Sequence, residues 1–209
     1  IASPMANKNI TWEKTEQINF GVDATFFNNK LTATLDVFRK DTRDILLNLP
    51  VVYMLGVSAP MQNAGEVRNT GFELQLGHNN RINDFQYSAT ANISYVKNEI
   101  TDLKGSDTPG QSVGDPLSAY FGYVCEGIFR EQSDIDNHAD QSIFGQPVLG
   151  DLMYKDVNGD KVVNTDDRVI LGSSFPKWNF GLNLSASYKG FDVSALLQGA
   201  ADVKAMTPS

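Results

Sequence analysis

The segment DVNGDKVVNTDD, residues 156–167, carries oxygen donors at the spacing of a calcium loop. Such a loop takes ligands from positions 1, 3, 5, 7, 9 and 12, of which position 7 supplies a backbone carbonyl. These hard oxygen ligands suit Ca²⁺, so the sequence predicts a structural calcium ion here. With Asp156 at position 1, the candidate ligands are Asp156, Asn158, Asp160, the carbonyl of Val162, Asn164 and Asp167.

Two positions depart from the usual calcium loop. Position 6 is Lys161 instead of glycine, and a left-handed backbone costs a non-glycine residue about 1–2 kcal/mol, unless Gly159 shifts the sharp turn. Position 12 is Asp167 instead of the longer glutamate. The alternative is therefore an acidic Asx-rich turn that needs no ion.

The flanks of this loop, DLMY and RVILG, resemble strand or extended chain. A calcium switch of the EF-hand type needs amphipathic helices on both sides. We therefore expect a structural clip on a loop and no sensor.

Composition excludes several classes of protein. The formal charge of -8 and the pI near 4.7 argue against nucleic acid as a partner, because its phosphates need a basic surface. A single cysteine excludes a disulfide within the chain. No apolar run is long enough for a transmembrane helix, and the first residues have no signal-peptide pattern, so we interpret the chain as part of a longer protein.

The elements that must position these residues are long strands. Apolar and polar residues alternate with a period of two, as in Phe85, Tyr87, Ala89, Ala91 and Ile93 against polar neighbours. Short turns and long links alternate, and aromatic residues gather at the short-turn ends. The predicted strands lie near residues 15–28, 30–44, 66–77, 84–97, 177–188 and 190–199, with long links at 45–65 and 97–175.

Two all-β folds agree with this pattern. A transmembrane β-barrel has tight turns on one side, long loops on the other and aromatic residues at the interfaces. A soluble, calcium-stabilised β-sandwich that binds carbohydrate also alternates, but its strands are usually about five or six residues long. The longer strands favour a large antiparallel barrel over a sandwich. Because six strands are too few to close such a barrel, the chain is expected to be a piece of one.

Several blocks in one order resemble the SusC/RagA family of TonB-dependent outer-membrane transporters. They are ITWEKTEQINFGVDATFFNNKLTATLDVFRKDTRDILL, NAGEVRNTGFELQL, GDPLSAYFGYVCEGIF and DLMYKDVNGDKVVNTDDRVILGSSFPKWNFGLNLSASYKGFDVSALLQG. The resemblance covers nearly the whole chain and places it in the later part of the barrel, with the plug domain outside this sequence.

The resemblance implies a barrel of about 22 strands in the bacterial outer membrane, surrounded by lipid. It also implies uptake of an oligosaccharide (a glycan fragment) or a peptide. A SusD-like surface lipoprotein acts as a lid, and TonB pulls on the plug and the N-terminal segment. This is transport without covalent chemistry, so no enzyme is expected.

Other candidate sites are weaker. His78 and His138 lie far apart and are expected in surface loops, and Cys125 is expected to be a quiet, buried thiol. Asp134, Asp136 and Asp140 fit a solvated loop better than an acid/base pair. Tyr53, Tyr120, Phe121 and Tyr123 either stack on sugar rings or pack the loops on each other.

Overall fold

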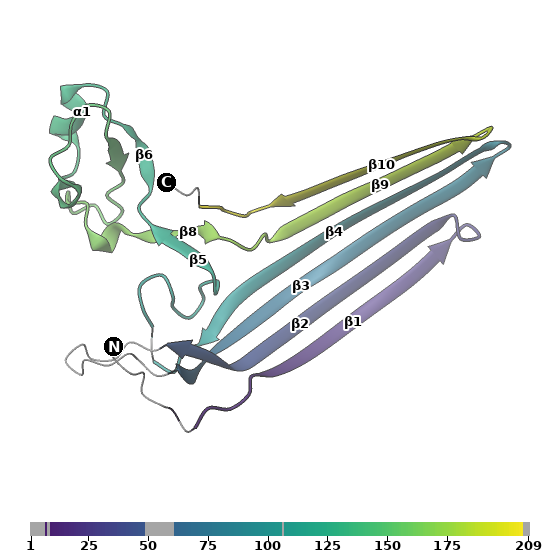
Figure 1. Cartoon of the computed structure of the whole chain (residues 1–209), viewed down its shortest axis with the longest axis horizontal. Helices are drawn as coiled ribbons and strands as arrows, with labels where there is room; N and C mark the ends of the chain where they lie inside the picture. The colour runs from purple at the N-terminus through teal and green to yellow at the C-terminus, as the bar shows by residue number, and fades with distance from the viewer. Residues whose placement is uncertain (1–6, 8, 49–60, 106, 207–209) are drawn as a thin grey trace.

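The long strands form one antiparallel sheet in a computed structural model that describes residues 7, 9–48, 61–105 and 107–206. The strand order is β1-β2-β3-β4-β9-β10, so the two edges belong to β1 and β10 (Figure 1). The prediction of an all-β antiparallel fold is confirmed. The six strands are β1 (Lys14–Phe26), β2 (Leu31–Asn48), β3 (Met61–Ile82), β4 (Phe85–Asp102), β9 (Trp178–Tyr188) and β10 (Phe191–Ala201).

Three short hairpin turns lie together at one end of the sheet (Figure 1). The turn between β9 and β10 consists of Lys189 and Gly190, with φ angles of 47° and 87°. Positive φ at both central residues is the twist that two-residue hairpins favour. Asn83 between β3 and β4 also has a positive φ, 54°, which asparagine tolerates better than most residues.

The pairing of β2 with β3 extends well beyond the predicted ends of these two strands. β2 continues to Asn48 and β3 begins at Met61, so both strands enter the range 45–65 that was expected to be a loop, and residues 49–60 lie outside the described residues. A register shift between Thr42 and Ile45, with Asp44 at a φ of 59°, breaks the alternation that marked the strand. Asn63 stabilises this bulge because its Nδ2 donates to the carbonyl of Asp44 at 2.6 Å.

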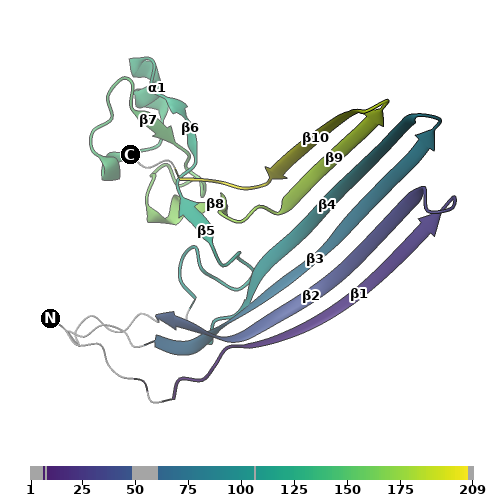
Figure 2. The same ribbon diagram turned by 45° about the vertical axis from the view of Figure 1, so that its right-hand side comes forward.

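The link between β4 and β9 contains short elements, of which the sequence indicated only the extended flanks DLMY and RVILG, which form strands β7 and β8. They lie beyond the long strands, at the end opposite the hairpin turns (Figures 1 and 2). Each has only three to six residues, too short to show a period in the sequence. They are β5 (Ala119–Gly122), which pairs with β8 (Val169–Ser173), β6 (Cys125–Ile128), which pairs with β7 (Leu152–Tyr154), the helix α1 (Gln132–Asn137) and the 3-10 turns η2 (Ser142–Phe144) and η3 (Thr165–Asp167).

A small apolar core joins this external link to the sheet. Val67, Ile100 and Leu103 are buried there, and Leu117 from the link packs against them. The backbone of Ile100 also bonds to the link, accepting from Gly114 and donating to Asp115. Within the described residues, no helix is long and apolar enough to span a membrane.

The side of the sheet that is apolar changes along β3 and β4. Val67 and Ile100 belong to the face that carries Glu73 and Asn92 further down the same strands. On the opposite face, Phe72 and Tyr95 are followed toward the link by charged residues. Near the hairpin turns, the face that carries Phe72 and Tyr95 is apolar. Near the external link, the opposite face is the apolar one.

Candidate functional site

The candidate calcium loop is held by hydrogen bonds from its own backbone. Asp156 accepts the N–H of Gly159 at 2.7 Å through Oδ1 and that of Lys161 at 2.8 Å through Oδ2. Asn158 accepts from the N–H of Asp160, and Asp160 accepts from that of Val162. Further on, Asn164 accepts from the N–H of Asp166 in the same way. All the proposed side-chain ligands thus already organise the loop.

The backbone makes the bend that a calcium loop needs at position 6. Lys161 has a φ of 69°, and Gly159, two residues earlier, has a φ of 79°. Gly159 therefore does not relieve Lys161 of the left-handed conformation. The register of the loop is kept at the expense of backbone strain at a non-glycine residue.

Asp167, the last proposed ligand, is fully buried. Its Oδ2 accepts the N–H of Asn164 at 2.8 Å, and its Oδ1 accepts the N–H of Val157 at 2.8 Å. The hydrogen bond from Asn164, with those from Val157 and Asn158, lowers the pKa of Asp167 below its usual value, although burial acts in the opposite direction. A charged carboxylate thus ties the two ends of the loop together.

The donor set fits calcium chemically. An ionised carboxylate has about four lone-pair sites, so Asp156 and Asp167 can accept backbone N–H groups and still face a cation. In the described part of the chain, no three His, Cys, Asp or Glu side chains are grouped so as to hold a metal ion. A cation would therefore also need the amide and carbonyl oxygens of Asn158, Val162 and Asn164. Calcium binding at this loop stays a prediction.

The expectation of a surface loop is wrong for His78, whereas His138 does lie in the external link, outside its helices and strands. His78 lies inside β3, where its ring stacks on Tyr87 with centroids 5.5 Å apart. His138 directly follows α1 and is half-buried, with Nε2 2.9 Å from the carbonyl of Tyr154 and its ring edge-on to Phe129. The spacing of residues in the sequence could not show these contacts, because each partner residue (Tyr87, Tyr154 and Phe129) belongs to a different part of the fold from the histidine that it contacts.

The expectation of a buried Cys125 is wrong, because this thiol is exposed in β6, where Sγ contacts the carbonyl of Gly127 at 3.3 Å. β6 belongs to a two-stranded sheet, which cannot cover both of its faces. The apolar neighbours in the sequence therefore did not imply burial.

The acidic and aromatic residues of the link have local roles. Asp134 caps α1 by accepting from the N–H groups of Arg130 and Glu131. Tyr123 lies 4.9 Å from Phe144 and 5.6 Å from Tyr154 between ring centroids. Its contacts support packing of the link on itself, whereas Tyr53 lies outside the described residues. Asp136 accepts from Gln132, and Asp140 accepts from the N–H of Ser142.

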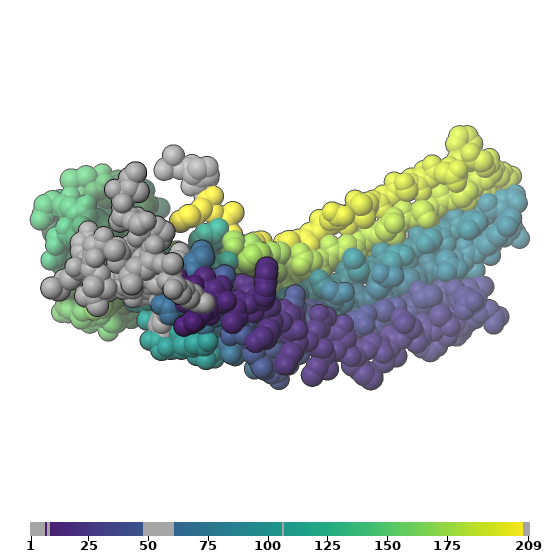
Figure 3. Space-filling model, turned by 60° about the horizontal axis from the view of Figure 1, so that its bottom comes forward, coloured from purple at the N-terminus to yellow at the C-terminus, as the bar shows by residue number. Residues whose placement is uncertain are grey.

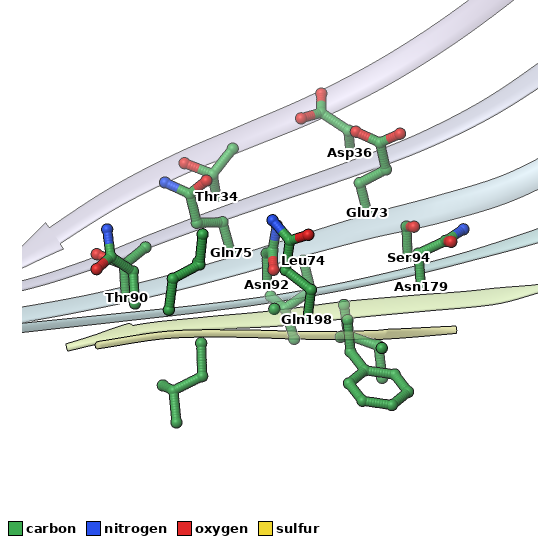
Figure 4. A pocket seen from close by; sticks show the side chains of 17 residues that line it. Thr34, Asp36, Glu73, Leu74, Gln75, Thr90, Asn92, Ser94, Asn179 and Gln198 are labelled. Atoms are coloured by element: carbon green, nitrogen blue, oxygen red, sulfur yellow. The ribbon is translucent and has the colours of Figure 1, made fainter. Parts of the chain in front are cut away.

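One face of the long strands is polar and hollowed. Figure 4 shows side chains from β2, β3, β4, β9 and β10 along a depression of about 530 Å³. Asp36 and Glu73 face each other directly across β2 and β3. Gly21 opposite Asp36 allows a close approach, because a Cβ there would lie 2.5 Å from Oδ1 of Asp36. The other polar side chains of the depression are Thr34, Gln75, Thr90, Asn92, Ser94, Asn179, Asn183 and Gln198.

The opposite face carries exposed apolar side chains. Phe20 is 69% exposed and Val193 is also 69% exposed, so within the described residues no second sheet covers this face. Figure 3 shows the long strands extending away from the external link. A sandwich would bury these side chains against another sheet.

Aromatic residues bound the apolar face at both ends. Near the hairpin turns lie Phe85, Tyr188 and Phe191, in one row across three strands. A second row, which was not predicted, lies near the external link, where Trp178 lies 4.7 Å from Tyr95 and 6.0 Å from Phe72 between ring centroids. From Trp178 to Tyr188 β9 rises about 33 Å, which at a barrel tilt gives a height of about 25 Å. Counting back along β9 from Tyr188 would have revealed this second row.

Comparison with known proteins identifies the same architecture. Residues 2–201 match the family model described as TonB dependent receptor-like, beta-barrel. TonB-dependent receptor P26 of Formosa agariphila is 33% identical over 208 residues, an alignment that covers 93% of this chain and 21% of the relative. TonB-dependent receptor SusC of Bacteroides thetaiotaomicron is 28% identical, with 93% of this chain and 20% of SusC covered.

Solved structures agree with the sequence relatives. The RagAB peptide importer in its open-open state superposes with a TM-score of 0.74 at 26% identity, over 96% of this chain and 22% of the importer chain. The closed-closed state gives a TM-score of 0.73. This chain therefore spans about a fifth of the length of these proteins. It belongs to the TonB-dependent receptor β-barrel family, in the group that contains SusC and RagAB.

Proposed function

We propose that the protein containing this chain imports a nutrient across the bacterial outer membrane, using energy delivered by TonB. The observation that carries the proposal is the sheet with two unlike faces. Its apolar face, bounded by aromatic rows about 25 Å apart in height, suits the lipid of a membrane. Its polar, hollowed face suits a water-filled lumen. In this arrangement the chain supplies barrel wall and external loops, and makes or breaks no covalent bond.

The proposed partners follow from the relatives. RagAB is described as a peptide transporter, and SusC is a TonB-dependent receptor. We assign this chain an oligosaccharide or peptide cargo, a SusD-like surface lipoprotein over the external link, and TonB acting through a plug and an N-terminal segment encoded elsewhere in the protein. The hairpin-turn end of the sheet faces the periplasm, and the link faces the cell exterior.

Uptake in the native host tests this function. Cells lacking the gene for the full-length protein should fail to accumulate one of two probes, a labelled neutral oligosaccharide mixture or a labelled peptide mixture. Restoring the gene should restore uptake only while the proton gradient that powers TonB is intact. Unchanged uptake of both probes would contradict an import function.

We also propose that the loop at 156–167 binds one Ca²⁺ as a structural clip. Its calcium-loop register and the left-handed Lys161 support this proposal. Calorimetric titration of the full-length protein with Ca²⁺ should show a saturable heat that Asp160→Ala removes. Asp166→Ala, which removes the same charge at a position outside the ligand register, should keep it. Equal heats in both variants would favour the acidic turn that needs no ion.

A further inference from the structure

The first row beyond the apolar face that carries charge holds two cations, Arg39 and Lys97, with Thr70 between them. Along the strands, Phe72 and Tyr95 are followed on the same face by Thr70 and Lys97, and the neighbour of Thr70 on β2 is Arg39. Adjacent strands lie about 4.8 Å apart, so Arg39 and Lys97 are about 10 Å apart across Thr70. Arg39, Thr70 and Lys97 are all exposed. We call these three residues the basic row.

The acids that pair with the basic row lie in the next row on the same face, toward the external link. Asp41 accepts from Nε of Arg39 at 2.7 Å, and its side chain is 16% exposed where that of Arg39 is 51% exposed. Glu99 pairs with Lys97, with exposures of 24% and 55%. In both pairs the cation is more exposed than its carboxylate, so the outermost charges of this row are positive, although Glu16 in the next row is also exposed.

The basic row has donors left for a second partner. Arg39 uses Nε for its bond to Asp41, which leaves the two amino groups of its guanidinium. Asp41 also receives Nε of Arg68 at 2.6 Å, so this one carboxylate balances two guanidinium groups. Thr70 adds a hydroxyl between the two cations.

The position of the basic row identifies its partner. On the side of the hairpin turns lie Val37, Phe72 and Tyr95, which belong to the apolar face assigned to lipid. A molecule that fits both surfaces has an acyl chain and an anionic head at the depth where the hydrocarbon ends. We propose that Arg39, Thr70 and Lys97 bind the phosphate of an anionic lipid in the outer leaflet, whose acyl chain lies against Phe72 and Tyr95. This inference rests on the proposed membrane location.

Lipid retention by the full-length protein tests the site. The protein is reconstituted into phosphatidylcholine nanodiscs with and without phosphatidylglycerol, and the lipids that stay bound are counted by native mass spectrometry. Arg39→Gln with Lys97→Gln should weaken retention of phosphatidylglycerol about thirtyfold, because each basic residue near an anionic surface contributes about a factor of five to binding. Arg39→Lys with Lys97→Arg should retain the lipid, since the cations remain.

The matched control removes two cations from the same face further from the membrane. Lys14 and Arg43 face each other across β1 and β2, about 13 Å beyond Arg39 along the strand. Lys14→Gln with Arg43→Gln should leave retention unchanged. Equal loss in both double variants, or none in either, would overturn the site, as would full competition by inorganic phosphate. Failure of the native protein to enter neutral nanodiscs would overturn the membrane location together with the site, which distinguishes the two failures.

Discussion

At the scale of single residues, Lys161 is a strained position of the candidate calcium loop. Its φ of 69° lies in the left-handed region, where the Cβ of every residue except glycine comes too close to the following carbonyl oxygen. The side chain of Lys161 is exposed, so its packing gives no reason for a lysine at this position.

Replacing Lys161 by glycine should stabilise the loop. Lys161→Gly removes a cost of about 1 kcal/mol at a positive φ, and hydrogen exchange of the amides in residues 155–168 should slow accordingly. Calcium affinity should rise in the same variant, because the bend is then free of strain. Lys155→Gly is the control: its φ is not positive, so glycine there should speed exchange.

The sequence predicted the spacing of this loop but not the environment of single residues. The register of Asp156 to Asp167 follows from spacing alone, as does the need for a bend at Lys161. The burial of Asp167 and the exposure of Cys125 depend on which elements pack against them, and no local pattern contains that information.

At the scale of elements, Gly71 sets the close packing of β2, β3 and β4. A Cβ on Gly71 would lie 2.8 Å from Cζ of Phe38 and would also press against the carbonyl of Tyr95. Gly71 is buried, so these neighbours have little room to shift.

Adding this one methyl group should loosen the sheet. Gly71→Ala should lower the free energy of unfolding of the full-length protein by about 1–3 kcal/mol through overpacking. Denaturant titration in lipid vesicles measures the loss. Gly122→Ala meets only the tip of Leu171 at 3.3 Å, so a comparable loss in that variant would show that the close contacts at Gly71 are not the cause.

The strands could be predicted where alternation is unbroken, and their ends could not. Bulges between Thr42 and Ile45 and between Glu66 and Val67 shift the period by a residue, so pattern matching stops there while the pairing continues. In the link between β4 and β9 only the extended flanks of the calcium loop could be predicted, because the other elements are shorter than any period that could reveal them.

At the scale of the whole molecule, the two faces of the sheet should respond differently to the same substitution. Leu184 lies on the apolar face, about midway between Trp178 and Tyr188, and Asn183 is its neighbour on the polar face. Leu184→Lys should cost about 2–4 kcal/mol if that face meets the middle of a bilayer. Asn183→Lys, facing water, should cost little. Urea unfolding of the full-length protein in vesicles compares them, and equal losses would contradict the assignment of the faces.

The change of apolar side along β3 and β4 limits how these strands can vary in evolution. One inserted residue between Val67 and Phe72 would reverse one segment relative to the other, sending either the small core into solvent or the aromatic row into the lumen. Length differences among homologues in this stretch should therefore come as pairs of residues, or be accompanied by a bulge that restores parity.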